Sequence, residues 1–191
     1  MNAAAHQGAR IGPNAVLQLM AVLDRAEGRI VRDRVLAGLR LPAPDSGMIP
    51  EAEAIAAHRA VRAALPDRAD GLLVAAGEAT ADYILRHRIP APAKLVIRLL
   101  PGALGARLLA RAIERHAWTF AGSGRFRVAG FAPLTFELVH NPLVTQGKTC
   151  LWHAAVFRRL FAALVWRGCR VEEVACAGLG AGHCRFLILP Q

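Results

Sequence analysis

The C-terminal stretch Gly168–Pro190, GCRVEEVACAGLGAGHCRFLILP, carries the clearest pattern in the chain. Apolar and polar residues alternate as far as Cys176, which predicts a strand with one solvent-facing side. Glycine then occupies every second position in a short run that predicts a turn with unusual backbone angles. Alternation resumes from His183 to Leu189 and predicts a second strand. The stretch is therefore predicted to be a β-hairpin.

This hairpin would gather several metal-ligating side chains. Glu173 and Cys176 lie near the end of the first predicted strand, and Cys184 begins the second. Cys150 is a fourth candidate, and the four side chains would complete a tetrahedral zinc site with no open position. The residues alone leave two alternatives, because free cysteines are often buried as small apolar residues and could also form a disulfide.

Two neighbouring residues compete with Glu173 for the fourth ligand position. Glu172 is adjacent, but Glu173 has the x-x-Cys spacing to Cys176. His183 adjoins Cys184, and strand alternation directs its side chain to the opposite face. Glu173 is therefore the favoured ligand.

Composition limits the class of protein. The chain has 191 residues, a hydrophobic fraction of 54% and a net charge of +10. This length and composition predict a globular domain with a substantial core. The basic residues are mostly single arginines without clustered aromatics, so we expect no nucleic-acid partner. An acidic protein or the carboxylates of a small ligand stay open as partners.

The sequence also bears on location. Residues 1–10 lack the apolar core of a signal peptide. Arginines at 98, 107 and 111 interrupt the longest apolar region, so no transmembrane segment is predicted. We expect a cytoplasmic protein with reduced cysteines, which favours a metal site over a disulfide.

Helical and strand patterns are segregated along the chain. Residues 1–12 are expected to be disordered, and 41–50 to form a linker. Helices are predicted at 13–28, 30–39, 51–65, 67–87, 94–100, 104–118 and 149–167. Further strands are predicted at 125–128 and 134–139. The order predicts an α+β fold, with a helical N-terminal half packed on a small antiparallel sheet.

The block 126–189 resembles the 4-vinyl-reductase domain family. The resemblance is carried by Cys150 and by the run from Glu173 through Cys176 and the alternating glycines to Cys184 and Phe186. It implies a ligand-binding fold related to that of vesicle-tethering transport-particle subunits. In the regulator branch of the family, one Cys, one Glu and two further Cys bind a structural zinc. That pattern falls here on Cys150, Glu173, Cys176 and Cys184.

The layout of the chain is most similar to the members of this family in bacteriochlorophyll biosynthesis. The resemblance divides the chain into an extension with a linker, 1–49, and a ligand-binding domain, 50–191. It implies an accessory protein without catalytic residues, which binds a magnesium porphyrin or protochlorophyllide intermediate. Delivery would be to a pathway enzyme of the magnesium chelatase or methyltransferase type. A homodimer, and attachment to the membrane through such partners, are compatible with this function.

Two other functions stay open. The first is a divinyl (4-vinyl) protochlorophyllide reductase, which would need an external electron donor because the chain shows no dinucleotide, flavin or cluster motif. The second is an interaction module that responds to a small ligand. We expect the ligand between the helix 104–118 and the strands 125–128 and 134–139.

In that pocket, aromatic side chains would form the wall, two arginines would bind carboxylates, and a histidine would reach the magnesium. His116 is favoured for the magnesium over His140 and His153. A second location is the helix after Cys150, around Trp152 and Phe157. The candidate ligand-binding residues are His116, Trp118, Arg125, Phe126, Arg127, Phe136 and Trp152.

Overall fold

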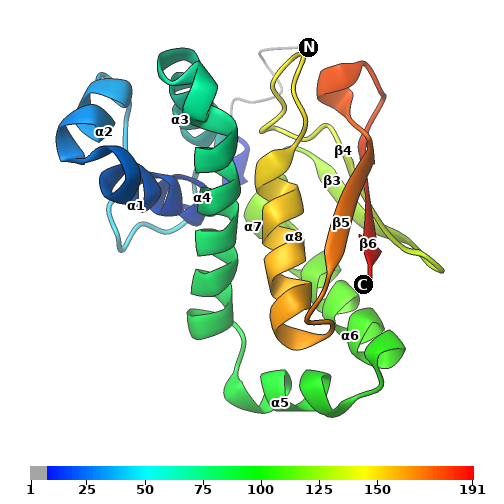
Figure 1. Cartoon of the computed structure of the whole chain (residues 1–191). Coiled ribbons are helices and arrows are strands. Elements are labelled where there is room, and N and C mark those ends of the chain that lie inside the picture. The colour runs from blue at the N-terminus through cyan, green and yellow to red at the C-terminus, as the bar shows by residue number, and fades with distance from the viewer. Residues whose placement is uncertain (1–7) are drawn as a thin grey trace.

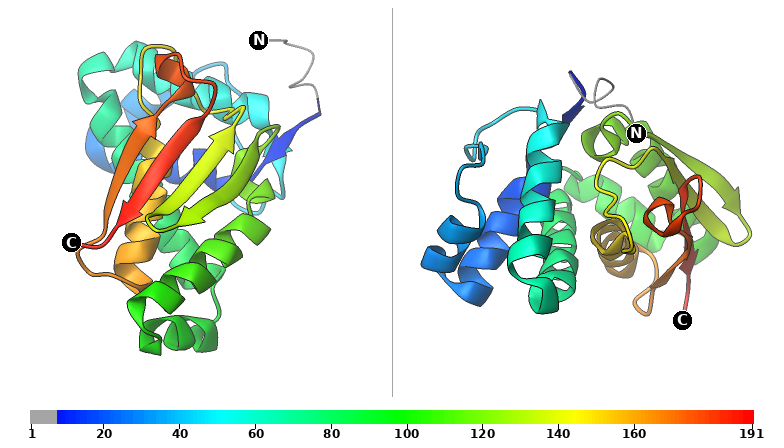
Figure 2. Two further views of the ribbon diagram at one scale, coloured as in Figure 1. Left: turned by 90° about the vertical axis from the view of Figure 1, so that its right-hand side faces the viewer. Right: turned by 90° about the horizontal axis from the view of Figure 1, so that it is seen from above.

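A four-stranded antiparallel sheet forms the C-terminal half of the computed structural model, which describes residues 8–191. Its strands are β3 (Arg125–Phe131), β4 (Leu134–Val139), β5 (Arg170–Ala175) and β6 (Cys184–Leu189). They are ordered β3-β4-β6-β5, so the hairpin β5–β6 joins the sheet through β6. Helix α8 (Leu151–Leu164) covers one face of the sheet, and Figure 2 (left) shows the other face uncovered.

The helices form two further layers beyond α8. They are α1 (Asn14–Glu27), α2 (Arg29–Val35), α3 (Glu51–Ala64), α4 (Pro66–His87), α5 (Ala91–Leu99), α6 (Gly102–Arg115) and α7 (Trp118–Ala121). Helix α4 lies beside α8, and α1 packs on the side of α4 away from α8 (Figure 1; Figure 2, right). The predicted α+β class is confirmed, and α8 is the element that joins the helical layers to the sheet.

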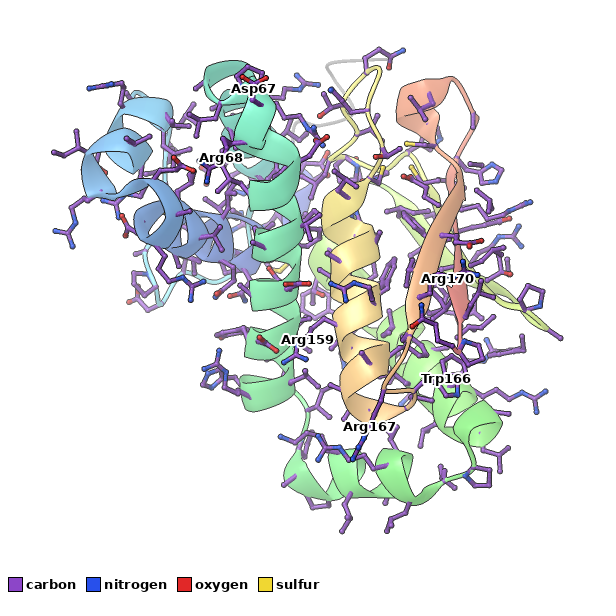
Figure 3. The ribbon with its side chains drawn as sticks, viewed as in Figure 1. Asp67, Arg68, Arg159, Trp166, Arg167 and Arg170 are labelled. Atoms are coloured by element: carbon purple, nitrogen blue, oxygen red, sulfur yellow. The ribbon has the colours of Figure 1, made fainter. Side chains whose placement is uncertain are left out.

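Helices α4 and α8 approach each other closely at Gly77. A Cβ at this position would lie 2.4 Å from the carbonyl oxygen of Trp152, so a side chain does not fit here. Farther along the same contact, Arg159 donates a 2.8 Å hydrogen bond to Asp82 (Figure 3). The glycine and the ion pair together fix how α8 sits against α4.

The first described residues are ordered, contrary to the expected disorder of residues 1–12. Strand β1 (Arg10–Ile11) pairs with β2 (Ile49–Pro50), and Ile11 is fully buried. This pairing joins positions almost forty residues apart, which local sequence patterns do not reveal. The rest of that expectation, residues 1–7, lies outside the described residues.

One apolar core runs through all the layers. Its buried residues extend from Ile11 to Ile188, so the N-terminal segment shares a core with the domain expected to begin at residue 50. Beneath the sheet the core is aromatic, with the rings of Phe136 and Phe157 5.0 Å apart and those of Phe157 and Phe186 5.4 Å apart. Within residues 8–191, none of the helices combines the length and apolar character needed to cross a bilayer.

Candidate metal centre and ligand-binding residues

A β-bulge in β5 brings two of the candidate ligands to one face. Glu173 pairs with Phe186, whereas Ala175 pairs with the residue before Phe186, so the register gains one residue at Val174. Without the bulge, alternation would place Glu173 and Cys176 on opposite faces of the strand. The extra residue reverses the alternation and turns both side chains inward. The x-x spacing of the pair is thus the sequence trace of the bulge.

The turn between β5 and β6 is closed by backbone contacts that need glycine. A Cβ on Gly178 would lie 2.4 Å from the carbonyl oxygen of Lys148 and 2.5 Å from that of Thr145. The amide of Gly147 donates a 2.7 Å hydrogen bond to the carbonyl of Gly178. Gly180 has a φ of 95°, which favours glycine. The loop before α8 is therefore held directly against the turn.

These elements gather the four predicted metal ligands at the start of α8. Cys150, Glu173, Cys176 and Cys184 place their ligand atoms within 4.8 Å of one another. The Sγ atom of Cys150 lies 3.3 Å from that of Cys184 and 3.5 Å from that of Cys176. The three thiols are buried, and no disulfide joins them.

The neighbouring candidates lie outside this cluster. The carboxylate of Glu172 lies 3.0 Å from Arg170 on the outer side of the sheet. The Nε2 atom of His183 lies 3.9 Å from Glu137, also on the outer side. Asn141 is a cluster residue that the sequence analysis missed, since no local pattern marks it. Its Nδ2 atom lies 3.2 Å from the Sγ atom of Cys150 and 3.6 Å from that of Cys184.

The thiols strongly influence one another's protonation. The hydrogen bond with Cys150 lowers the pKa of Cys184 to about 6, despite burial. The same bond, with burial, raises the pKa of Cys150. Burial, followed by a hydrogen bond with Glu173, raises the pKa of Cys176 to about 11. Neighbouring negative charge opposes ionisation of all three thiols, and a divalent cation would neutralise that charge.

The donor set and its geometry fit zinc. Tetrahedral zinc with Zn–S bonds of about 2.3 Å separates its sulfur ligands by about 3.8 Å. The two short sulfur distances, 3.3 and 3.5 Å, are close to this value. Glu173 uses Oε2 to accept a hydrogen bond, whereas its Oε1 is buried without a partner among the described residues. That oxygen is free to serve as the fourth ligand.

The predicted pocket between the helix 104–118 and the sheet is not the arrangement found. Phe126 and Phe136 are buried and pack on each other with ring centroids 5.1 Å apart. Arg125 and Arg127 alternate with Phe126 along β3 and are exposed on the opposite face of the sheet. Arg127 pairs there with Glu137. The structure corrects the prediction, because arginines on that face cannot form the mouth of a pocket walled by Phe126.

The other two members of the predicted pocket lie on the surface. Trp118 is 58% exposed, because the predicted helix ends at Arg115 and a separate short helix, α7, begins at Trp118. His116 is exposed, and its Nδ1 atom lies 2.8 Å from the carbonyl oxygen of Ala112. His140 is exposed as well. Two surface hollows, one along α1 and α4 and one at the end of α8, are lined by none of the predicted ligand-binding residues.

A buried polar cluster lies at the second predicted location. Trp152 and His153 are 5% and 1% exposed, and their rings lie 4.9 Å apart. His58 of α3 lies beside Trp152, with ring centroids 5.9 Å apart. Trp152 Nε1 and His153 Nε2 are buried and have no hydrogen-bond partner in the part of the chain that the structure describes. Such atoms are costly to bury, which makes this seam a candidate binding site.

Burial keeps both histidines of the seam neutral. It lowers the pKa of His58 to about 4 and that of His153 to about 3. A hydrogen bond with the Phe120 backbone opposes the shift of His153. Because Nε2 is unpartnered, Nδ1 must make this bond, and the acceptor is the Phe120 carbonyl. The lone pair of Nε2 is therefore directed into the seam.

The C-terminal half of the chain defines the class of protein. Residues 139–190 match the 4-vinyl-reductase domain, so all four candidate metal ligands lie inside this domain, as the sequence resemblance implied. The chain is 56% identical over 187 residues to the bacteriochlorophyll synthase 23 kDa chain of Rhodobacter capsulatus, covering 95% of this chain and 88% of that protein. It is 52% identical over 188 residues to the protein of the same name from Cereibacter sphaeroides, covering 95% and 91%. The chain belongs to this family of bacteriochlorophyll synthase 23 kDa chains.

Solved structures with a similar fold are H-NOX proteins. An Fe(II) unliganded H-NOX mutant from K. algicida superposes with a TM-score of 0.63 and 15% identity, covering 93% of this chain and 95% of that one. An H-NOX structure from work on heme distortion gives a TM-score of 0.57 and 14% identity, covering 93% of each chain. At this identity the similarity defines the fold alone.

Proposed function

We propose that this chain is an accessory protein of bacteriochlorophyll biosynthesis that binds a magnesium tetrapyrrole intermediate and delivers it to a pathway enzyme. Both relatives carry the name of a bacteriochlorophyll synthase chain, which supports the pathway. The H-NOX fold supports the class of ligand, since heme distortion is described for that family. Heme is an iron porphyrin, and the pathway's intermediates are flat rings of the same kind.

The unpartnered Nε2 atom of His153 is the observation that carries the proposal. Neutral imidazole is a common metal ligand, and a hydrogen bond from the other ring nitrogen fixes the tautomer and orients the ring. His153 meets both conditions, because its Nδ1 is bonded to Phe120 and its pKa is far below neutral. It would supply the axial ligand of the magnesium.

The surroundings of His153 suit a flat apolar ring. Phe120, Phe157 and Phe186 all lie within 6.5 Å of the imidazole, measured between ring centroids. The unpartnered Nε1–H of Trp152 would donate to a carbonyl or carboxylate of the ligand. Side chains fill this seam, so a macrocycle enters only if α4 and α8 separate, and their close contact at Gly77 is where they would part.

We also propose that Cys150, Glu173, Cys176 and Cys184 hold a zinc ion. Four protein ligands leave no coordination position for water or substrate, so the role of the metal would be structural. Zinc would join the residue just before α8 to the hairpin β5–β6. It would thereby hold in place the helix that carries Trp152 and His153.

Absorbance titration with magnesium protoporphyrin tests the proposed function. Wild-type protein should bind it with a shift of the Soret band that reports histidine ligation. His153→Leu should lose the shift and bind about tenfold or more weakly, since the axial bond is lost. Unchanged far-ultraviolet circular dichroism would show that this variant is folded.

Two matched variants locate the site. His116→Leu removes the histidine favoured by the sequence, and Trp118→Ala removes the exposed tryptophan of the first predicted pocket. Both should bind as wild type does, because neither side chain faces the seam. Wild-type affinity in His153→Leu, with loss of binding in either of the other variants, would move the ligand to the α6 side of the sheet.

A further inference from the structure

Helices α5 and α6 expose large apolar side chains at one end of the molecule. Their exposed fractions range from 44% to 76%. We call this set the α5–α6 apolar face; it consists of Leu95, Val96, Leu99, Leu104 and Leu108. Figure 1 shows α5 lying across the lower end of the molecule, beyond the ends of α4 and α8.

The spacing of these residues makes each helix amphipathic in the outward direction. Leu95 and Leu99 are four residues apart, as are Leu104 and Leu108, so each pair occupies one face of its helix. Ile97 is the buried residue of α5, and it lies on the opposite side of the helix. The larger apolar side chains of α5 are thus placed on the surface. Exposed apolar patches of this kind mark interaction sites.

The charge around this face has a single sign. Between Asp82 and Glu114 the sequence contains no acidic residue. The same segment carries six cationic residues: Arg86, Arg88, Lys94, Arg98, Arg107 and Arg111. The two acids that bracket the segment are occupied, because Asp82 accepts a hydrogen bond from Arg159 and Glu114 accepts hydrogen bonds from Arg111 and from the backbone of Val128.

A hollow beside α5 adds to the cationic surroundings. It has a volume of about 430 Å³ and is lined by Arg98, Arg167 and residues 162–165 at the end of α8. Figure 3 places Arg167 just beyond α8, above α5. Two guanidinium groups thus border a concave site next to the apolar face. Guanidinium groups bind phosphate oxygens in a bidentate manner.

We propose that the α5–α6 apolar face docks on the surface of an anionic lipid bilayer. Apolar side chains flanked by Lys and Arg, without acids, are the composition of helices that lie in the membrane interface. Anionic headgroups attract the cations, and the leucines enter the boundary with the acyl chains. A second copy of the chain is a poorer occupant, because a symmetric contact would bring like charges together. The proposal is independent of zinc and of the tetrapyrrole.

Vesicle sedimentation tests the proposal with the intact protein. Vesicles of phosphatidylcholine with about one third phosphatidylglycerol should bind the protein, and vesicles of phosphatidylcholine alone should bind it far less. Binding should weaken between about 0.1 M and 1 M salt, over which the Debye length falls from about 10 to 3 Å. Equal binding to both kinds of vesicle, or to neither, would overturn the proposal.

Variants identify the face. Leu95→Ser with Leu99→Ser should lower the partition coefficient about tenfold or more, because the inserted apolar groups are lost. Arg107→Gln should lower it about fivefold, as expected for one charge near an anionic surface. The matched control is Ile30→Ser, which removes a side chain that is 77% exposed on α2 and should leave binding unchanged.

The other occupants give different results. If two copies cover the face, sedimentation velocity will show a dimer that Leu95→Ser with Leu99→Ser converts to a monomer, and vesicles will not bind. If an acidic protein covers it, the chain will be a monomer that binds neither kind of vesicle. Each result would overturn the lipid assignment, as would full vesicle binding by the double leucine variant.

Discussion

The backbone amide of Cys150 donates a 2.7 Å hydrogen bond to the Oε2 atom of Glu173. Cys150 is the residue that caps the first turn of α8, and Glu173 lies in β5. A helix N-terminus leaves amides without partners, and here a carboxylate from a distant strand satisfies one of them. The bond leaves Oε1 unpartnered among the described residues and next to three thiols. One carboxylate thus anchors the helix and offers a metal ligand.

Glu173→Gln separates these two roles. The amide oxygen can still accept the bond from Cys150, but the negative charge and the strong metal donor are lost. We expect zinc content, measured by elemental analysis after dialysis against a weak chelator, to fall from one per chain to well below one. Glu172→Gln is the matched control, since the carboxylate of Glu172 pairs with Arg170 outside the cluster. Equal zinc content in both variants would exclude Glu173 as a ligand.

Cys184→Ser should lower stability through the metal. A buried site left with uncompensated charge costs about 3–5 kcal/mol. For a chain of this size that corresponds to a fall in Tm on the order of 10 °C. A strong chelator should bring the Tm of wild-type protein down to that of Cys184→Ser and should leave the variant unchanged.

Cys169→Ser is the control for this prediction. Cys169 is buried but lies outside the four-residue cluster. Its variant should keep the full response to chelator. A chelator that leaves the Tm of wild-type protein unchanged would contradict a structural zinc.

The metal cluster could be predicted because its determinants are local. Alternation and the glycines specify the hairpin β5–β6, and the family pattern adds Cys150. The contribution of Asn141 could not be predicted, because its contact with Cys150 depends on the path of the loop before α8. The sequence showed the spacing of Glu173 and Cys176 but not its cause, which is the bulge at Val174.

The ligand pocket was harder to predict because it depends on which face of each element is covered. The pattern of β3 shows that Arg127 and Phe126 face opposite ways, but it does not say which side α8 occupies. Trp118 was assigned to the face of a continuous helix, whereas the chain turns after Arg115 and exposes it. The burial of His153 depends on the packing of α8 against α3 and α4, which no local pattern encodes.

The two buried histidines predict a loss of stability in mild acid. Burial lowers the pKa of His58 to about 4 and that of His153 to about 3, whereas an unfolded histidine has a pKa of about 6.5. Below pH 6.5 the unfolded chain therefore takes up protons that the folded chain refuses. The free energy of unfolding should fall as the pH drops from 6.5 toward 4, by up to about 1.4 kcal/mol per pH unit for each histidine.

Urea unfolding between neutral pH and pH 4.5 measures this effect. His58→Gln keeps a donor for the carbonyl of Ala15, which lies 3.0 Å from the Nε2 atom of His58, but it cannot take up a proton. Its free energy of unfolding should depend less steeply on pH than that of wild-type protein. The metal cluster is the same in both proteins, so its titration cancels in the comparison. Parallel pH profiles would show that His58 is not neutral in the folded state.

Gly77→Ala tests the contact between α4 and α8. The added methyl group would lie 2.4 Å from the carbonyl oxygen of Trp152 and 2.8 Å from Ala155, so the helices must shift apart. Overpacking of this kind costs about 1–3 kcal/mol. Gly71→Ala, in the same helix, meets no atom within 4 Å and should stabilise the protein by about 0.5–1 kcal/mol, because alanine favours a helix. If the seam opens to admit the tetrapyrrole, Gly77→Ala should lose stability yet bind magnesium protoporphyrin at least as fast as wild-type protein, in stopped-flow absorbance. Slower binding in Gly77→Ala than in Gly71→Ala would place the entrance away from the α4–α8 contact.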